Sequence, residues 1–206
     1  ELGSVYASLG SQVVLVEMEK RLIPGADPEL VDVLAKSLKK VFESIRYETR
    51  VKELEEREDE VGVVFEGSDG EEEIYDRVLV AVGRKPLSGE MGFENTHVKV
   101  DDKGFIQVDE KMRTDDERIF AVGDIVGGAM LAHKAMYEGK VAAEAIAGQP
   151  SAFDARAIPA VVYANPQLAW CGLSEKHAEE EGRDVAVRRF PWSASGRAAS
   201  MGAKEG

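Results

Sequence analysis

Cysteine is almost absent from this chain, since Cys171 is the only one among 206 residues. A single cysteine cannot form a disulfide within the chain, and it fits a reducing compartment. The residues around it, from Leu168 to Leu173, are mainly apolar. This setting predicts a buried, structural thiol rather than a reactive or metal-binding one.

Basic residues are also scarce: Lys and Arg number 26 against 39 Asp and Glu, which gives a formal net charge of -13. Nucleic acid and anionic membranes would repel such a chain, so neither is an expected partner. No apolar run approaches the roughly 20 residues of a membrane-spanning helix, and no signal peptide is recognisable. We therefore expect a cytoplasmic protein.

Histidine is rare as well, and His97 has no other His or Cys near it at the spacing of a metal site. We expect no metal and an exposed His97. The remaining composition, 44% hydrophobic and 32% charged, is typical of a globular protein of one or two domains. The chain begins with Glu1, and residues 1–10 have the pattern of the middle of a helix, so we expect a piece of a longer protein.

The most informative stretch is 114–124. Its apolar end, Ile119 to Val122, predicts a buried strand; Gly123 permits close approach of a ligand, and Asp124 can accept a hydrogen bond from a sugar hydroxyl. A helix should open at Met130 and run to about residue 147, with N–H groups that favour negative charge. This order is the strand-end geometry at which open α/β sheets bind nucleotides. The alternative is an ordinary βα unit in which Asp124 only caps a helix.

The N-terminal part resembles the back half of a Rossmann unit. Gly3 and Gly10 would let a helix pack close to a sheet, and an apolar strand at 13–16 ends in Glu17, a candidate ligand for the ribose of a dinucleotide. An acid at this position favours NAD over NADP. The Gly-rich fingerprint G-x-G-x-x-G is absent from the chain, so a plain helix and strand ending in a solvated Glu is an open alternative.

Other elements follow from hydrophobic periodicity. Asp27 and Pro28 should open a helix whose core stripe is Leu30, Leu34, Leu38 and Val41. The pattern predicts an antiparallel meander at 49–54, 61–65 and 74–75 with a turn at 67–70, a central buried strand at 78–82, and a connection over 87–97. Further strands are expected at 105–109, on both sides of an Asn-Pro turn at 165–166, and at 185–190, with a helix from Ser174 to Gly182.

Four motifs resemble the flavoprotein disulfide reductases with two dinucleotide-binding domains. T-x-x-x-x-I-F-A-V-G-D at 114–124 and L-A-H-K-A-x-x-E-G at 131–139 are similar to that family's second flavin-binding motif. A-x-G-R-x-P at 81–86 matches a segment beside the NAD. P-x-x-x-Y-x-x-P-E-x-A-x-x-G-L-S-E matches 159–175, where Gln167 replaces the usual Glu and Cys171 the usual Val.

The resemblance implies an α/β fold in three parts. Residues 1–86 would be a partial, Rossmann-like NAD-binding domain, and residues 87–150 the second half of an FAD-binding domain. Residues 151–206 would begin an α+β dimerisation domain.

The resemblance also implies two cofactor sites. Asp124 should contact the ribitol of FAD, and Ala132 should offer its backbone N–H to the flavin ring. His133 is expected to act by packing or polar contact, since it does not belong to the family's catalytic pair. The predicted FAD-binding residues are Asp124, Met130, Leu131, Ala132 and His133. The predicted NAD-binding residues are Glu17, Val51, Ala81, Gly83 and Arg84, with Glu1 near the nicotinamide.

The cofactor roles leave alternatives open. Val51 aligns with a position that contacts adenine, although a core role fits it equally well. Gly83 could serve only in a tight turn between domains.

The stretch Phe190 to Ala198, together with L-A-H-K-A, favours one activity within the family. Such members are homodimers that oxidise dihydrolipoamide, carried by the acyltransferase component of 2-oxo acid dehydrogenase complexes, through a cysteine pair and FAD, and reduce NAD+. Reduction of glutathione disulfide or of mercuric ion, and a non-catalytic dimerisation or assembly role, remain alternatives. This chain contains neither the C-x-x-x-x-C pair nor the His base, so no catalytic residue is assigned and we expect the chain alone to be inactive and to bind either cofactor poorly.

Overall fold

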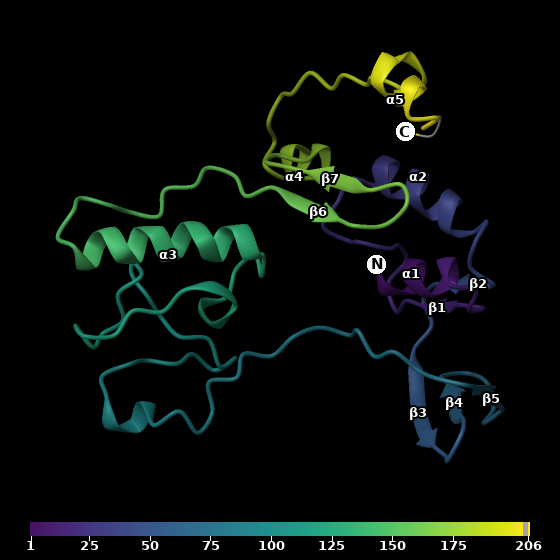
Figure 1. Cartoon of the computed structure of the whole chain (residues 1–206), viewed down its shortest axis with the longest axis horizontal. Coiled ribbons are helices and arrows are strands. Elements are labelled where there is room, and N and C mark those ends of the chain that lie inside the picture. The colour runs from purple at the N-terminus through teal and green to yellow at the C-terminus, as the bar shows by residue number, and fades with distance from the viewer. Residues whose placement is uncertain (204–205) are drawn as a thin grey trace. The chain divides into compact units, whose positions relative to one another are not determined.

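The computed structural model describes residues 1–203 and 206. The chain divides into two compact units (Figure 1). Unit 1 contains residues 1–80 and 159–206, and unit 2 contains residues 81–158. The predicted domain boundaries after residues 86 and 150 stay predictions.

Unit 1 begins with a βαβ arrangement. Helix α1 (Leu2–Ser8) precedes strand β1 (Val14–Val16), helix α2 (Pro28–Leu38) and strand β2 (Ser44–Arg46). β1 and β2 pair in parallel, with Leu15 opposite Ile45, and α2 provides the crossover connection that parallel strands need. A Cβ added to Gly3 would lie 3.2 Å from Phe42 Cζ, so α1 packs closely there, whereas a Cβ on Gly10 would meet nothing within 4 Å and the predicted close packing at Gly10 is wrong. β2 itself was missed by the sequence pattern.

Helix α2 carries the core of unit 1, but its buried face differs in part from the prediction. Val31, Leu34 and Leu38 are buried, whereas Leu30 and Val41 are 41% and 58% exposed. The spacing of the buried residues follows the helical repeat, so Leu30 lies on a neighbouring face, and Val41 lies beyond the end of the helix. The buried residues of this cluster are Leu22, Val31, Leu34, Leu38, Phe42 and Leu168.

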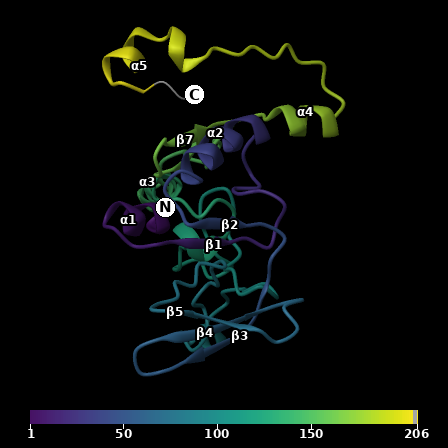
Figure 2. The ribbon, with the colours of Figure 1, turned by 90° about the vertical axis from the view of Figure 1, so that its right-hand side faces the viewer.

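The predicted meander is confirmed with shifted ends. β3 (Val51–Glu56), β4 (Val61–Phe65) and β5 (Glu72–Tyr75) form an antiparallel sheet in this order (Figure 2). The turn between β4 and β5 contains Gly67 and Gly70, both with positive φ (81° and 86°). β5 is tied to β2, because Arg46 donates two hydrogen bonds of 2.7 and 2.9 Å to Glu73.

The C-terminal part of unit 1 confirms the strands on either side of the Asn-Pro turn. β6 (Ala160–Val162) and β7 (Leu168–Trp170) are antiparallel, and α4 (Glu175–Glu180) follows, with the Ser174 hydroxyl accepting a hydrogen bond from the backbone N–H of His177. Residues 192–194 and 196–200 form the short helices η3 (Trp192–Ala194) and α5 (Gly196–Ser200). Together with the elements from α1 to β5, these segments make unit 1 a mixture of helices and strands.

Two predictions for this region are wrong. No strand forms at 185–190, where all residues except Val187 are exposed, because no partner strand in the described part of the chain lies along it. Cys171 is exposed, since it follows the end of β7, beyond the strand whose Leu168 points into the core.

Unit 2 contains one long helix, α3 (Ala132–Ile146), and the 3-10 helices η1 (Phe93–Asn95) and η2 (Gly123–Val126). Its apolar core is small: Met112, Val141 and Ala142 are buried, and Phe120 and Phe153 pack against them. The strands predicted at 105–109 and 119–122 are reduced to the isolated bridges Val100–Ile106 and Arg113–Phe120. In unit 2, α3 covers these loops where the prediction expected a sheet.

The strand predicted at 78–82 is also wrong. Leu79, Val80 and Val82 are 54%, 63% and 93% exposed. A strand persists only where a neighbour takes its backbone hydrogen bonds, and among residues 1–203 and 206 no strand pairs with this segment. An apolar composition therefore predicts a buried strand only where a neighbouring strand is present.

Candidate functional site

Asp124 lies in the first turn of η2, at the point where the 119–122 segment gives way to α3. Gly123 has φ +85°, and a Cβ on it would lie 3.3 Å from the Ala135 Cβ. The turn closes with the backbone N–H of Gly127 donating to the carbonyl of Asp124 at 3.1 Å. A side chain at position 123 would push the turn away from α3, so the glycine places Asp124 directly beside the helix.

The turn is fixed by two charged residues of α3 that lie one helical turn apart. Lys134 is 6% exposed and Glu138 is 2% exposed, and their Nζ and Oε1 atoms are 2.6 Å apart. Glu138 accepts a hydrogen bond of 2.7 Å from the backbone N–H of Gly123. Lys134 donates one of 2.9 Å to the carbonyl of Gly127. The two ends of the turn are therefore attached to the same helix.

The carboxylate of Asp124 is bound by Arg84. Arg84 donates to its Oδ2 at 3.0 Å and to the carbonyl of Met130 at 3.5 Å. The ion pair is open to solvent, with side-chain exposures of 66% for Arg84 and 51% for Asp124. An oxygen of Asp124 is thus accessible to hydroxyl donors of a ligand.

Helix α3 starts at Ala132, two residues after the predicted opening at Met130, and its start is not capped. The N-cap residue is Leu131, whose apolar side chain makes no capping hydrogen bond. The backbone N–H of Ala132, in the first turn, has no acceptor within the helix. Met130 and Leu131 are half-buried, while Ala132 and His133 are exposed. A ligand acceptor could use this helix start.

The predicted NAD-binding residues divide between the two units. In unit 1, Glu17 follows β1, its backbone N–H donates to the carbonyl of Arg46 at 2.8 Å, and its carbonyl accepts from the N–H of Thr49 at 3.0 Å. Its carboxylate accepts from the N–H of Glu19 at 2.9 Å. Val51 opens β3 two residues after Thr49 and is 39% exposed. The structure therefore brings Glu17 and the start of β3 to the same end of the parallel strands.

The other NAD candidates have looser surroundings. Glu1 uses its carboxylate to accept a hydrogen bond of 2.7 Å from the N–H of Tyr163 in unit 1. Ala81 and Gly83 are exposed in unit 2. Gly83 has φ +133°, a backbone conformation that disfavours any side chain.

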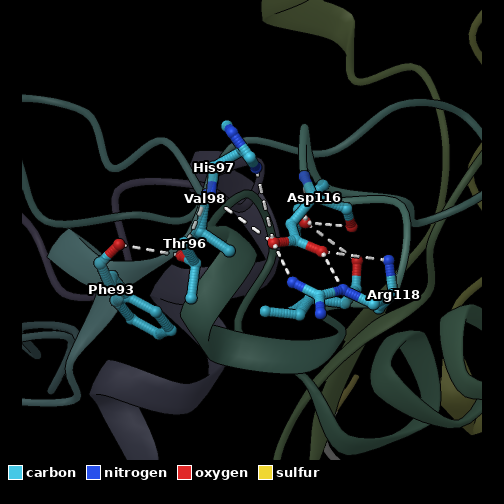
Figure 3. A network of polar contacts seen from close by, with 8 residues as sticks. Phe93, Thr96, His97, Val98, Asp116 and Arg118 are labelled. Carbon is cyan, nitrogen blue, oxygen red and sulfur yellow. Dashed lines mark hydrogen bonds and ion pairs between the residues drawn. The ribbon is translucent and has the colours of Figure 1, made fainter.

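A polar network in unit 2 was not found from the sequence (Figure 3). Asp116 is 3% exposed, and its carboxylate accepts three hydrogen bonds of 3.1 to 3.2 Å from the backbone and guanidinium of Arg118. It also accepts one of 3.5 Å from the N–H of His97. The Arg118 guanidinium holds the pKa of the Asp116 carboxyl well below its ordinary range. This network fixes the loop that leads to Asp124.

A cavity of about 550 Å³ in unit 2 is lined by Gln107, Val108, Asp109, Arg113, Thr114, Asp115 and Glu117. None of the predicted cofactor residues lines it.

The predicted exposure of His97 is confirmed, since its side chain is 84% exposed. Within residues 1–203 and 206, no group of three or more His, Cys, Asp or Glu is arranged to hold a metal ion. No helix in this part of the chain has the length and hydropathy of a membrane span.

A glycine-bounded acidic turn near a helix start and an acid at the end of a parallel strand are both features with which α/β proteins bind nucleotides. The family description "pyridine nucleotide-disulphide oxidoreductase" matches residues 1–139, and the dimerisation domain of the same family matches residues 158–206. The chain belongs to the pyridine nucleotide-disulphide oxidoreductase family.

Curated relatives match over the whole chain. It is 46% identical over 208 residues to the dihydrolipoyl dehydrogenase of Vibrio parahaemolyticus and 45% identical over 208 residues to that of Geobacillus stearothermophilus. Both alignments cover 100% of the chain and 44% of the relative. The chain therefore spans less than half the length of the curated relatives that it matches.

Solved structures agree with this assignment. The HOCl-induced flavoprotein disulfide reductase RclA from Escherichia coli superposes with a TM-score of 0.89 at 26% identity, over 100% of this chain and 47% of that one. LpdA from Mycobacterium tuberculosis gives a TM-score of 0.87 at 24% identity, over 99% of this chain and 44% of that one. The second likeness shows the fold alone. The mixed fold predicted from the sequence is confirmed.

Proposed function

We propose that this chain forms part of a dihydrolipoyl dehydrogenase, which oxidises dihydrolipoamide through a redox disulfide and FAD and reduces NAD+. The observation that carries the proposal is the 46% identity to an enzyme of that name over the full length of the chain. In this proposal the Asp124 turn would serve one dinucleotide and the Glu17 strand end the other.

The residues around Asp124 fit a flavin. The half-exposed carboxylate offers acceptors for the ribitol hydroxyls, and the uncapped start of α3 offers the N–H of Ala132 to an acceptor on the ring. Met130, Leu131 and His133 would contact the ring from the same segment. When bound, FAD supplies the electron transfer between dithiol and nicotinamide, while the protein orients it and excludes competing reactions.

The proposed NAD contacts are those that the family resemblance implies. Glu17 would accept hydrogen bonds from the adenosine ribose, and Val51 would contact the adenine. Ala81, Gly83 and Arg84 would run beside the dinucleotide, with Glu1 near the nicotinamide. The position of Glu17 at the carboxyl end of β1, next to the start of β3, supports this assignment.

The partners in the proposal are a second copy of the chain and the acyltransferase component of a 2-oxo acid dehydrogenase complex. The match of residues 158–206 to a dimerisation domain supports the homodimer. A cytoplasmic location belongs to the proposal as well, and the single cysteine, which suits a reducing compartment, supports it. Neither nucleic acid nor a membrane surface is proposed as a partner.

The flavin site is tested by the variant Asp124→Asn. Loss of a charge-assisted hydrogen bond should weaken FAD about ten-fold or more, measured by quenching of flavin fluorescence. The control is Asp102→Asn, which makes the same charge change at an exposed position of unit 2. Equal FAD affinity of the two variants would remove Asp124 from the site.

The NAD site is tested by Glu17→Gln, with Glu19→Gln as the control at an exposed position two residues away. Removing the acidic acceptor should weaken NAD+ about ten-fold and reduce the preference over NADP+, measured by calorimetric titration. An unchanged ratio of the two affinities would contradict the assignment of Glu17.

The reaction itself needs two thiols, and this chain has one cysteine. The 206 residues alone should therefore show no NAD+-dependent oxidation of dihydrolipoamide above the rate without protein. Turnover by the purified chain at saturating NAD+ would contradict this expectation.

Another disulfide reductase is the second candidate, favoured by the likeness to RclA at a TM-score of 0.89. Fusing residues 1–206 in place of the matching segment of the Vibrio enzyme provides a test. Retained oxidation of dihydrolipoamide supports the first candidate. Loss of that activity, with a gain in reduction of glutathione disulfide, supports the second candidate. Loss without any gain supports a dimerisation or assembly role instead.

A further inference from the structure

We propose that Lys134 and Glu138 are a positioning pair, which attaches both ends of the turn 123–127 to α3 and so sets where Asp124 is presented to a flavin. The inference rests on the proposed flavin site. Neither residue is expected to touch the cofactor, since their polar atoms face the turn backbone and each other.

The pair is fully withdrawn from water. Glu138 is 2% exposed and Lys134 is 6% exposed. Charges at such positions lose their hydration, and the attraction within a buried ion pair often does no more than compensate for this loss. Net stabilisation of the fold is thus a poor reason for placing two charges here, and their other contacts must be considered.

The remaining hydrogen bonds of both groups go to the turn. Glu138 accepts from the N–H of Gly123 at 2.7 Å, and Lys134 donates to the carbonyl of Gly127 at 2.9 Å. Gly123 is the first residue of η2, and Gly127 directly follows its last residue. The two glycines therefore flank residues 124–126. Each charged group therefore holds one end of the turn that carries Asp124.

Glycine geometry makes these attachments possible. Gly123 and Gly127 have φ values of +85° and +78°, and a Cβ on Gly127 would lie 3.2 Å from the ring of Phe105. A Cβ on Gly128 would lie 3.5 Å from Lys134 Cε. The turn thus lies between α3 and Phe105 with little free space, and the pair selects one position for it.

Three variants separate positioning from stability. Lys134→Met removes the tether at Gly127 and leaves the Glu138 charge buried without its partner. The double variant Lys134→Met, Glu138→Gln has no buried charge, keeps an acceptor for the N–H of Gly123, and still lacks the tether at Gly127. The control is Glu144→Gln, which breaks the more exposed Lys140–Glu144 pair (side chains 68% and 34% exposed) at the same spacing in the same helix.

Each variant is characterised by thermal unfolding and by hydrogen–deuterium exchange of residues 123–127, and FAD affinity is measured by titrating the flavin-free protein. We expect Lys134→Met to lower the unfolding temperature and to weaken FAD. The double variant should regain the wild-type unfolding temperature, yet exchange faster at residues 123–127 and bind FAD about ten-fold more weakly, with a shifted visible band of the flavin. The control should match the wild type in all measurements.

The inference is overturned if the double variant regains FAD affinity and slow exchange as well as the wild-type unfolding temperature. The pair would then act only through stability. The Asp124→Asn variant keeps the two claims apart. If Asp124→Asn weakens FAD and the double variant does not, the positioning role fails while the flavin site stands. If Asp124→Asn has no effect on FAD, the flavin site itself fails.

Discussion

The two acidic residues proposed to hold cofactors are positioned in different ways. In unit 1, Glu17 follows a parallel strand pair, and the backbone on both sides of it is fixed by hydrogen bonds to Arg46 and Thr49. In unit 2, Asp124 lies in a turn that no strand ladder supports, and the side chains of Lys134 and Glu138 hold it. A sheet end thus places its carboxylate through main-chain pairing, whereas a turn requires specific side chains from a neighbouring helix.

The cores of the units differ in the same sense. Six buried apolar residues form one cluster in unit 1, and three form the cluster in unit 2. Unit 2 compensates with buried polar groups, namely Thr114, Asp116, Lys134 and Glu138. Unit 1 should therefore respond most to lost apolar volume, and unit 2 to lost polar partners.

The largest effect is expected for Glu138→Ala. It leaves the Lys134 ammonium buried without its partner, so unit 2 should lose about 3–5 kcal/mol of unfolding free energy. Both tryptophans, Trp170 and Trp192, lie in unit 1. Denaturation should accordingly be followed by exchange of the α3 amides. Glu144→Ala, in the same helix at a side chain that is 34% exposed, should change the value by less than about 0.5 kcal/mol; similar losses in both would contradict the comparison.

Leu34→Ala should destabilise unit 1 by about 3 kcal/mol, because it removes a fully buried side chain and leaves a cavity. Tryptophan fluorescence in a denaturant titration reports on this unit. Leu30→Ala, at the exposed position in the same helix, serves as the control and should cost only a small fraction of that amount. An unfolding midpoint of Leu34→Ala equal to that of Leu30→Ala would show that the core lies elsewhere.

Acid should act on the units through different carboxylates. Arg118 lowers the pKa of Asp116 in unit 2, and Arg46 lowers the pKa of Glu73 in unit 1. A carboxyl whose pKa is lower in the folded state stabilises the protein above its unfolded pKa of about 4 and loses that contribution as the pH falls further. Asp116→Asn should therefore reduce the acid sensitivity of unit 2 below about pH 4, as measured by amide exchange, and leave that of unit 1 unchanged.

The corresponding variant Glu73→Gln should reduce the acid sensitivity of unit 1, followed by tryptophan fluorescence, and by a smaller amount. Its side chain is 42% exposed, compared with 3% for Asp116, so solvent screens the interaction more strongly. If Glu73→Gln instead altered the acid sensitivity of unit 2, the assignment of each carboxylate to its own unit would be contradicted.

The smallest effect is expected for Arg84→Gln. This variant breaks an ion pair whose members are 66% and 51% exposed, and such pairs contribute no more than about 1 kcal/mol. Thermal unfolding with Arg50→Gln as a second exposed-pair variant provides the reference. A loss of unfolding free energy as large as that of Glu138→Ala would mean that the Arg84–Asp124 pair stabilises the fold as much as the Lys134–Glu138 pair does.

The sequence was sufficient wherever a local pattern determines the structure. The glycines of the turn at 67–70 and Ser174 as a helix cap were predicted and confirmed, and α3 begins within two residues of the predicted Met130. The segments at 78–82, 119–122 and 185–190 were not, because strand formation depends on a neighbour that composition cannot reveal.

The candidate site was predicted in part. Asp124 was found from its position after an apolar run and a glycine, but its contact with Arg84 joins residues 40 positions apart in the chain. Lys134 and Glu138 have the i, i+4 spacing that usually marks an exposed pair, and their burial became clear only when the packed face of α3 was known. The exposure of Cys171 depended likewise on where β7 ends.

The attachment of the turn to α3 has a consequence for motion. Lys134 and Glu138 lie on one helix, so any tilt or rotation of α3 carries both ends of the turn along with it. The spacing between the Asp124 carboxylate and the first amides of α3 is then preserved while the rest of the unit rearranges. A ligand held by these two groups would travel with the helix as a single rigid body.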